Sequence, residues 1–153
     1  MGLKQAGKAL AIYVGLEFVI AFGLFQNFAE AMLDCIEYTI NFLTDRQMGV
    51  PAHTGIAKAM GVSDDITNAL RNETRLADGK LEALRTFTLA VVRKRGAVSS
   101  DEVQTFIDAG YTQRQVLEII LVLSQKIMSN YINNIAETPV DEPFKKFDWT
   151  KNQ

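Results

Sequence analysis

The sequence predicts an all-α fold in a single domain. Helix-capping signals follow one another in order through the second half of the chain. The sequence contains neither a run of alternating polar and apolar residues nor an Asn-Gly turn, which are the signals of strands and hairpins. At 153 residues the chain is long enough to bury a real core, and no stretch resembles a linker between domains. We therefore treat residues 1–153 as one helical domain.

The first helices that can be bounded lie between residues 51 and 70. Pro51 suits a first helical position, and Gly61 suits a helix stop. Ser63 then precedes a short helix predicted over 64–70, with two aspartates in its first turn facing the positive end of the helix dipole.

Three longer helices are predicted after residue 77. The first is capped by Asp78 and ends at the basic run 93–95, with Gly96 as its stop. The second opens with a capping box and ends at Gly110, and the third opens with another capping box. The two boxes are Ser99 with Glu102 and Thr112 with Gln115.

The last helix is apolar on more than one side. Its main predicted stripe consists of Val116, Ile119, Ile120, Leu123, Ile127, Tyr131 and Ile135. Leu121, Val122 and Met128 fall outside that stripe, so the helix must be buried in a larger core or in a subunit interface. For a chain of this length, we expect an oligomer. Thr138-Pro139 stops the helix, and the tail to Gln153 is expected to be irregular.

Residues 9–25 are almost entirely apolar. A buried core or interface helix is the interpretation that we favour. The alternatives are a signal peptide, because lysines precede the stretch and 29–31 resembles a small-residue cleavage site, and a short membrane span. A span is disfavoured because the stretch is shorter than a bilayer requires and contains Glu17.

Charge and cysteine content exclude several classes of function. The formal net charge of −2 gives no electrostatic support for binding nucleic acid or an anionic membrane. A single cysteine cannot form a disulfide framework, which suits a reducing, cytoplasmic compartment. No cofactor motif is recognised. The expected ligand is a small-molecule substrate.

His53 is the single histidine of the chain and the first candidate for proton chemistry near neutral pH. A helix that opens at Pro51 would place its imidazole in the first turn, where unpaired backbone N–H groups favour anions. The alternative is a structural histidine bonded to a neighbouring carbonyl.

Several motifs resemble the AhpD-like alkylhydroperoxidase / carboxymuconolactone decarboxylase family, in its peroxidase-related branch. The motifs occur in order over about 51–149, whereas residues 1–50 diverge. They are the run 53–62 (HTGIAKAMGV), the helix start 80–85 (KLEALR), the turns 95–99 (RGAVS) and 109–112 (AGYT), and the closing segments 130–133 (NYIN) and 138–141 (TPVD). The resemblance implies a helical domain that assembles into trimers or hexamers.

The same resemblance implies where an active site would lie. The family histidine falls on His53, and the glutamate of its proton relay falls on Asp34. The two positions of the family's Cys-x-x-Cys pair fall on Arg46 and Gly49. Peroxide reduction needs a thiolate and a second sulfur to resolve the product, so we expect dithiol peroxidase activity, the antioxidant chemistry of the family, to be absent or reduced.

Three alternatives remain open at this stage. A one-cysteine mechanism would use Cys35, although the neighbouring Asp34 disfavours a thiolate. A decarboxylase-type mechanism would use His53 as general acid or base on a carboxylated lactone, with Arg46 holding the anion and Asp34 or Glu37 orienting the imidazole.

The third alternative is a non-catalytic oligomeric or binding module. Residues 109–116 resemble the turn and second helix of a helix-turn-helix motif. The acidic balance of the chain and the apolar continuation of that helix argue against DNA recognition. The basic run 93–95 is better explained as a helix end that complements its dipole.

Overall fold

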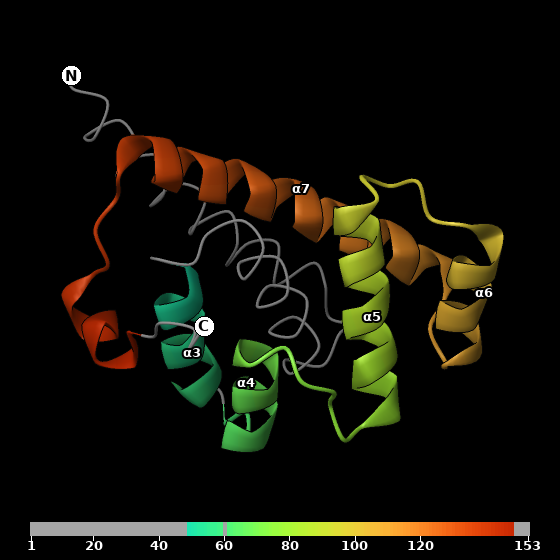
Figure 1. Ribbon diagram of the computed structural model, residues 1–153, viewed down its shortest axis with the longest axis horizontal. Coiled ribbons are helices and arrows are strands. Elements are labelled where there is room, and N and C mark those ends of the chain that lie inside the picture. Colours follow the sequence, from blue (N-terminus) through green and yellow to red (C-terminus); the bar gives the residue numbers. More distant parts are fainter. Residues whose placement is uncertain (1–48, 60, 149–153) are drawn as a thin grey trace.

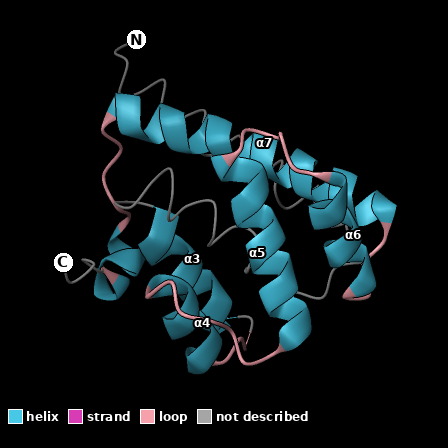
Figure 2. Cartoon of the chain, turned by 45° about the vertical axis from the view of Figure 1, so that its right-hand side comes forward, coloured by secondary structure: helices cyan, strands magenta, loops and turns pink. Residues whose placement is uncertain are grey.

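The computed structural model describes residues 49–59 and 61–148, and this part of the chain is helical throughout its regular structure (Figures 1 and 2). No strand occurs among these residues, which confirms the all-α prediction for them. The elements are α3 (Gly49–Ala59), α4 (Asp64–Arg71), α5 (Gly79–Arg93), α6 (Ser100–Asp108), α7 (Gln113–Ala136) and the 3₁₀ helix η1 (Glu142–Phe147).

Helix α7 organises the described part of the chain (Figure 1). Helices α5 and α6 lie near its N-terminal half, and α5 packs against both α6 and α7. After α7 the chain turns back, so that η1 packs against α3, which in turn contacts α4. Helices α3, α4 and η1 therefore form one group and α5 and α6 another (Figure 1).

The predicted N-terminal caps are confirmed. Asp78 accepts a hydrogen bond of 2.8 Å from the backbone N–H three residues further on. Both capping boxes are complete, Ser99 with Glu102 and Thr112 with Gln115, each with the reciprocal pair of side-chain to backbone hydrogen bonds. These bonds satisfy N–H groups that the first turn of a helix leaves without partners.

The predicted helix stops are also confirmed, although one helix start is wrong. Gly61, Gly96 and Gly110 have φ values of +82°, +85° and +95°, the left-handed conformation that glycine adopts without a steric cost. Helix α3 begins at Gly49, two residues before the predicted start at Pro51. A proline is tolerated there because N–H groups of the first turn have no partner within the helix.

The tail after Pro139 is not wholly irregular, contrary to the prediction. Residues 142–147 form η1, with Pro143 near its start and Asp141 in an extended conformation before it. The guanidinium of Arg71 donates a hydrogen bond of 2.6 Å from Nη2 to the carbonyl oxygen of Phe147. A segment this short depends on such tertiary contacts, which local sequence signals do not report.

Gly55 is where η1 approaches α3 most closely. A Cβ atom at this position would lie 2.7 Å from Cδ1 of Phe144 and 2.9 Å from Cε2 of Phe147. We expect Gly55→Ala to destabilise the protein by about 1–3 kcal/mol, because the two rings must move, although alanine is the better helix former. Chemical denaturation monitored by circular dichroism measures this change.

Gly79→Ala is the matched control for that substitution. Gly79 is also helical, and a Cβ there would meet no atom within 4 Å. This variant should be stabilised by about 0.5–1 kcal/mol. If both variants were stabilised alike, the packing of η1 on Gly55 would be wrong.

A stack of three aromatic rings forms the centre of the described core. The centroids of Phe87 and Phe106 are 4.5 Å apart, and those of Phe106 and Tyr111 are 4.3 Å apart. The phenol of Tyr111 donates a hydrogen bond of 2.9 Å to the carbonyl oxygen of Lys80, so the buried hydroxyl is satisfied. The stack joins α5, α6 and the turn that leads into α7. The other buried apolar residues of the core are Val50, Leu70, Leu76, Leu84, Val91, Ile119 and Val122.

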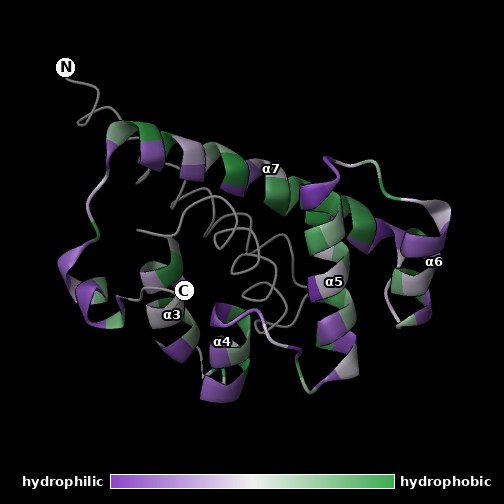
Figure 3. Ribbon diagram, in the orientation of Figure 1, coloured by the Kyte–Doolittle hydropathy of each residue, from purple (hydrophilic) through white to green (hydrophobic). Residues whose placement is uncertain are grey.

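The predicted main stripe of α7 is only partly the buried face. Ile119 is buried as predicted, but Ile120, Tyr131 and Ile135 are exposed. The inner face instead continues through residues that were placed outside the stripe or are polar, namely Val122, Asn130, Asn133 and Ala136. Figure 3 shows hydrophobic residues along the whole length of α7. With apolar residues on two sides, helical spacing alone did not identify the side that packs inward.

Residues 9–25, predicted to form an apolar helix, lie outside the described residues. Within 49–59 and 61–148, no helix combines the length and the apolar character that crossing a membrane requires.

Candidate functional site

Of the predicted site residues, the structure describes His53. It lies on α3 with its residue 6% exposed. Asp34, Cys35 and Arg46 lie outside the described residues, as does Glu37. Gly49, one of the two positions where the family carries a thiol, is the first residue of α3.

The position of His53 within its helix differs from the prediction. Because α3 begins at Gly49, His53 is the fifth residue of the helix and lies in its second turn. The influence of a helix terminus on a charge falls off within the first turn. The helix N-terminus is therefore a weaker source of anion binding at His53 than the sequence predicted.

The side chain of Lys126, from α7, lies beside His53. Nζ of Lys126 lies 2.8 Å from Nε2 of His53, although the two residues are 73 positions apart in the chain. In this hydrogen bond one nitrogen donates and the other accepts, and the tautomer of the imidazole sets which does which. With Lys126 as the ammonium donor, Nε2 accepts and the ring proton resides on Nδ1. The structure thus brings the side-chain nitrogen of Lys126 to a buried imidazole.

Sequence reasoning missed Lys126. The residue had one signal: it is the only charged residue between Ile119 and Ala136 in an otherwise apolar and neutral stretch. A long side chain with a charged end is rarely placed facing a core without a partner. Its partner could not be named, because the contact depends on which side of α7 faces α3 in the fold.

The inner face of α7 continues with polar side chains beyond Lys126. Asn130 and Asn133 follow at four and seven positions along the helix and are 2% and 6% exposed. Oδ1 of Asn133 is buried and accepts no hydrogen bond from the described residues. Buried amide groups are normally hydrogen-bonded. The inner face of α7 is therefore polar from Lys126 onward.

Local hydrogen bonding fixes the backbone of α3 around His53. The hydroxyl of the next residue, Thr54, donates to the carbonyl oxygen of Val50 at 2.7 Å. Val50, Thr54 and Ala57 are buried, with at most 1% of each residue exposed. The imidazole is therefore carried by a packed helix rather than by a loop, which suits a group that must be held in one orientation.

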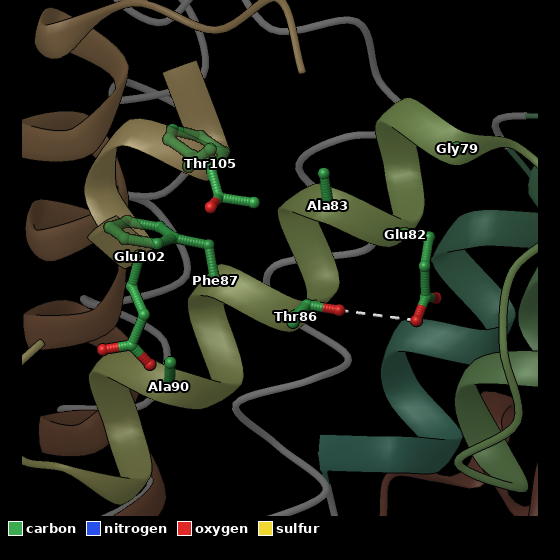
Figure 4. Close-up of a pocket in the computed structure, with 9 residues that line it drawn as sticks. Gly79, Glu82, Ala83, Thr86, Phe87, Ala90, Glu102 and Thr105 are labelled. Carbon is green, nitrogen blue, oxygen red and sulfur yellow. Dashed lines mark hydrogen bonds between the residues drawn. The ribbon is translucent and has the colours of Figure 1, made fainter. Parts of the chain in front are cut away.

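A separate pocket lies between α5 and α6 (Figure 4). It has a volume of about 310 Å³ and contains two carboxylates, Glu82 and Glu102. Both are already engaged. Glu82 accepts hydrogen bonds from Arg85, from the Leu76 N–H and from Thr86, and Figure 4 shows the bond from Thr86. Glu102 accepts a hydrogen bond of 2.6 Å from Lys94 and also takes part in the capping box of α6.

The pKa values of these carboxyls agree with structural roles. The hydrogen bond from Arg85 lowers the pKa of Glu82, and that from Lys94 lowers the pKa of Glu102. Each group is thus stabilised as a carboxylate, whereas a general acid needs a raised pKa. His53 does not line this pocket. Within the described ranges, no group of three or more histidine, cysteine or acidic residues could hold a metal ion.

Replacing Glu82 tests this structural role. We expect Glu82→Gln to lower the free energy of unfolding at pH 7 by about 1.5 kcal/mol, because the paired charge is lost. A carboxyl whose pKa is lowered by folding stabilises above its ordinary pKa, 4.5 here, and the effect is lost as pH falls through the folded value. The difference between wild type and variant should therefore shrink below pH 4.5 in denaturation curves recorded at several pH values.

Glu142→Gln is the control for this pH dependence. Glu142 pairs with Lys145 at the same i,i+3 spacing, but its side chain is 84% exposed. An exposed pair contributes less than about 0.5 kcal/mol. An equal loss of stability in both variants would contradict the role assigned to Glu82.

Comparison with protein-family models found no match for this sequence. Comparison with curated proteins found none either. The likeness to the AhpD-like family accordingly remains an inference from the motifs in the sequence.

Proposed function

We propose that this chain is a divergent AhpD-like / carboxymuconolactone decarboxylase protein that carries out acid–base chemistry without thiols. The observation that carries the proposal is the contact of 2.8 Å between Nε2 of a buried His53 and Nζ of Lys126. The reaction class is proton transfer on a small carboxylated substrate, of the decarboxylase or lyase type. A carboxylated lactone is the expected substrate.

In the proposed reaction, Lys126 binds the substrate and His53 transfers the proton. A substrate carboxylate is held by the ammonium of Lys126, the role that the sequence suggested for Arg46. Once the ammonium turns to the substrate, the lone pair of Nε2 on His53 is available to take a proton from solvent. Cleavage of the bond to the carboxylate releases CO₂ and leaves the electron pair on the substrate carbon, to which the imidazolium gives that proton, so the histidine ends the cycle neutral. No cofactor is required for these steps.

The chemistry of the residues disfavours dithiol peroxide reduction. The family's two thiol positions correspond to Arg46 and Gly49, and the chain has a single cysteine. Without an external thiol to reduce its sulfenic acid, a lone Cys35 would react once with peroxide or be oxidised further, and it would not turn over. The resemblance thus implies antioxidant chemistry, but this chain lacks the pair of thiols that the family's peroxidase mechanism uses.

A helix-turn-helix role is disfavoured by the character of α7. A recognition helix presents polar and basic side chains to the groove. On α7 the cations are Arg114, paired with Glu118, and Lys126, which contacts His53, and the exposed face is apolar.

Two assays on the full chain test the proposed function. The first follows turnover of carboxylated lactones, and the second follows consumption of an organic hydroperoxide with dithiothreitol as reductant. We expect turnover in the first assay, unchanged in Cys35→Ala, and none in the second. The proposal fails if lactone acids are not converted, or if peroxide is consumed. Peroxide consumption that Cys35→Ala abolishes would establish the one-cysteine mechanism.

A further inference from the structure

Large exposed hydrophobic side chains are concentrated on α7. Among the described residues, the six large apolar side chains that stand out as exposed all belong to this helix, and they are between 44% and 68% exposed. They are Leu117, Ile120, Leu121, Met128, Tyr131 and Ile135. Scattered exposed apolar residues are ordinary, whereas a continuous row on one helix marks an interaction surface.

The row has the spacing of a coiled-coil seam. We define the outer stripe as residues 117, 121, 124, 128, 131 and 135, whose intervals alternate between four and three. This is the spacing of the a and d positions of a heptad repeat. Ser124 is its one polar member, and Ile120 lies beside it. Ile119, Val122 and Lys126, which face the interior, lie on the opposite side of the helix.

We propose that the outer stripe pairs with the outer stripe of a second copy of this chain, with the two α7 helices antiparallel. The six exposed side chains offer on the order of 600 Å² per protomer, against roughly 800 Å² per partner in a standard interface. From Ile119 to the end of the helix, the stripe carries no charge that pairing would bury. The stripe therefore provides most of the apolar surface that a stable dimer needs.

The symmetry of the stripe suits a copy of itself. The alternating intervals are the same in both directions along the helix, so a two-fold axis level with Lys126 matches every position to another in the second copy. Leu121 then lies opposite Tyr131 of the second copy, and Ser124 lies opposite Met128 of the second copy. This is an isologous contact, in which the same surface is used on both sides.

The charge at the start of α7 favours the antiparallel direction. Arg114, whose side chain is 70% exposed, precedes the stripe at another seam position. Parallel helices would bring the two Arg114 side chains together and align the two helix dipoles. Antiparallel helices place each Arg114 beside the C-terminal end of the other α7, where partial negative charge and Glu137 lie. A two-fold contact is compatible with a hexamer, but it does not by itself build a trimer.

Sedimentation velocity of the full chain over a range of concentrations tests the pairing. We expect an even number of subunits for the wild type and a dimer Kd at least about 100-fold weaker for Leu121→Glu, whose charge would be buried. Asn68→Glu adds the same charge at an exposed position of α4, away from the stripe, and should leave the mass unchanged. Circular dichroism checks that both variants remain folded. A monomeric wild type, or a mass that Leu121→Glu leaves unaltered, would overturn the proposal.

Disulfide trapping in a Cys35→Ala background tests the direction. The double variant Leu121→Cys with Tyr131→Cys should form intermolecular disulfides, because these positions face each other only between antiparallel helices. Within one helix the two positions are too far apart to be bridged. Leu121→Cys alone should not cross-link efficiently. Efficient cross-linking of the single variant would show parallel helices and refute the arrangement.

Discussion

Replacing Lys126 with methionine is expected to lower kcat/KM on a carboxylated lactone by about 10²–10⁴-fold, the range typical of acid–base catalysis. Methionine keeps the length and apolar stem of the side chain but removes the charge that contacts His53 at 2.8 Å. That charge is the group to which the proposed function assigns the substrate carboxylate. His53→Gln should cause a loss of similar size, because the proton carrier is removed. Steady-state kinetics on the purified variants measures both effects.

The double variant shows whether the two residues act as one unit. If His53 can transfer the proton only to a substrate that Lys126 holds, the double variant should lose little more activity than either single variant. Losses that multiply would indicate independent roles. Lys80→Met is the matched control, because Lys80 is exposed and contacts the ring of Tyr111 rather than His53. Full activity in Lys126→Met would remove the basis of the proposed function.

The largest expected effect on stability is that of Phe106→Ala, about 3–5 kcal/mol of the free energy of unfolding. Phe106 is 1% exposed and lies between the rings of Phe87 and Tyr111. Truncation removes both ring contacts and leaves a cavity where α5, α6 and the start of α7 meet. Denaturant titration followed by circular dichroism should show the midpoint falling without a change in slope.

Phe144→Ala provides the comparison for that result. Phe144 is half-buried on η1, where it covers Gly55, so the same truncation removes less buried surface. We expect a loss of about 1–2 kcal/mol. A Phe106→Ala variant no less stable than Phe144→Ala would show that the aromatic stack is not the centre of this core.

Most of the described fold could be predicted because its signals are local. A capping residue, its partner three positions on and a glycine stop all lie within one helix, as at Ser99, Glu102 and Gly110. Helix η1 escaped prediction because it is held from outside, by Arg71 and by the close packing of Phe144 on Gly55. Contacts of this kind leave no local pattern in the sequence.

One residue of the candidate site could be predicted from the sequence and the other could not. His53 could be singled out by its chemistry alone, since no other side chain in the sequence has an ordinary pKa near neutrality. Lys126 could not, because α7 has two apolar sides and the sequence does not say which one faces the interior. The predicted stripe placed Ile120, Tyr131 and Ile135 on the inner face of α7. They are exposed in the structure, and the opposite side of the helix brings Lys126 to His53.

The return of η1 to α3 has a consequence for the order in which the chain folds. On the same side of the molecule, Arg71 at the end of α4 bonds to Phe147 of η1 across 76 residues of chain, and α5, α6 and α7 lie between them. Contacts of such long range form late, after the local helices. During synthesis, α3 emerges before the segment that covers it exists, so its Gly55 surface stays uncovered until η1 has been made. A nascent chain arrested before residue 142 would carry His53 on a helix that lacks this cover, so the candidate site is expected to be completed among the last steps of folding.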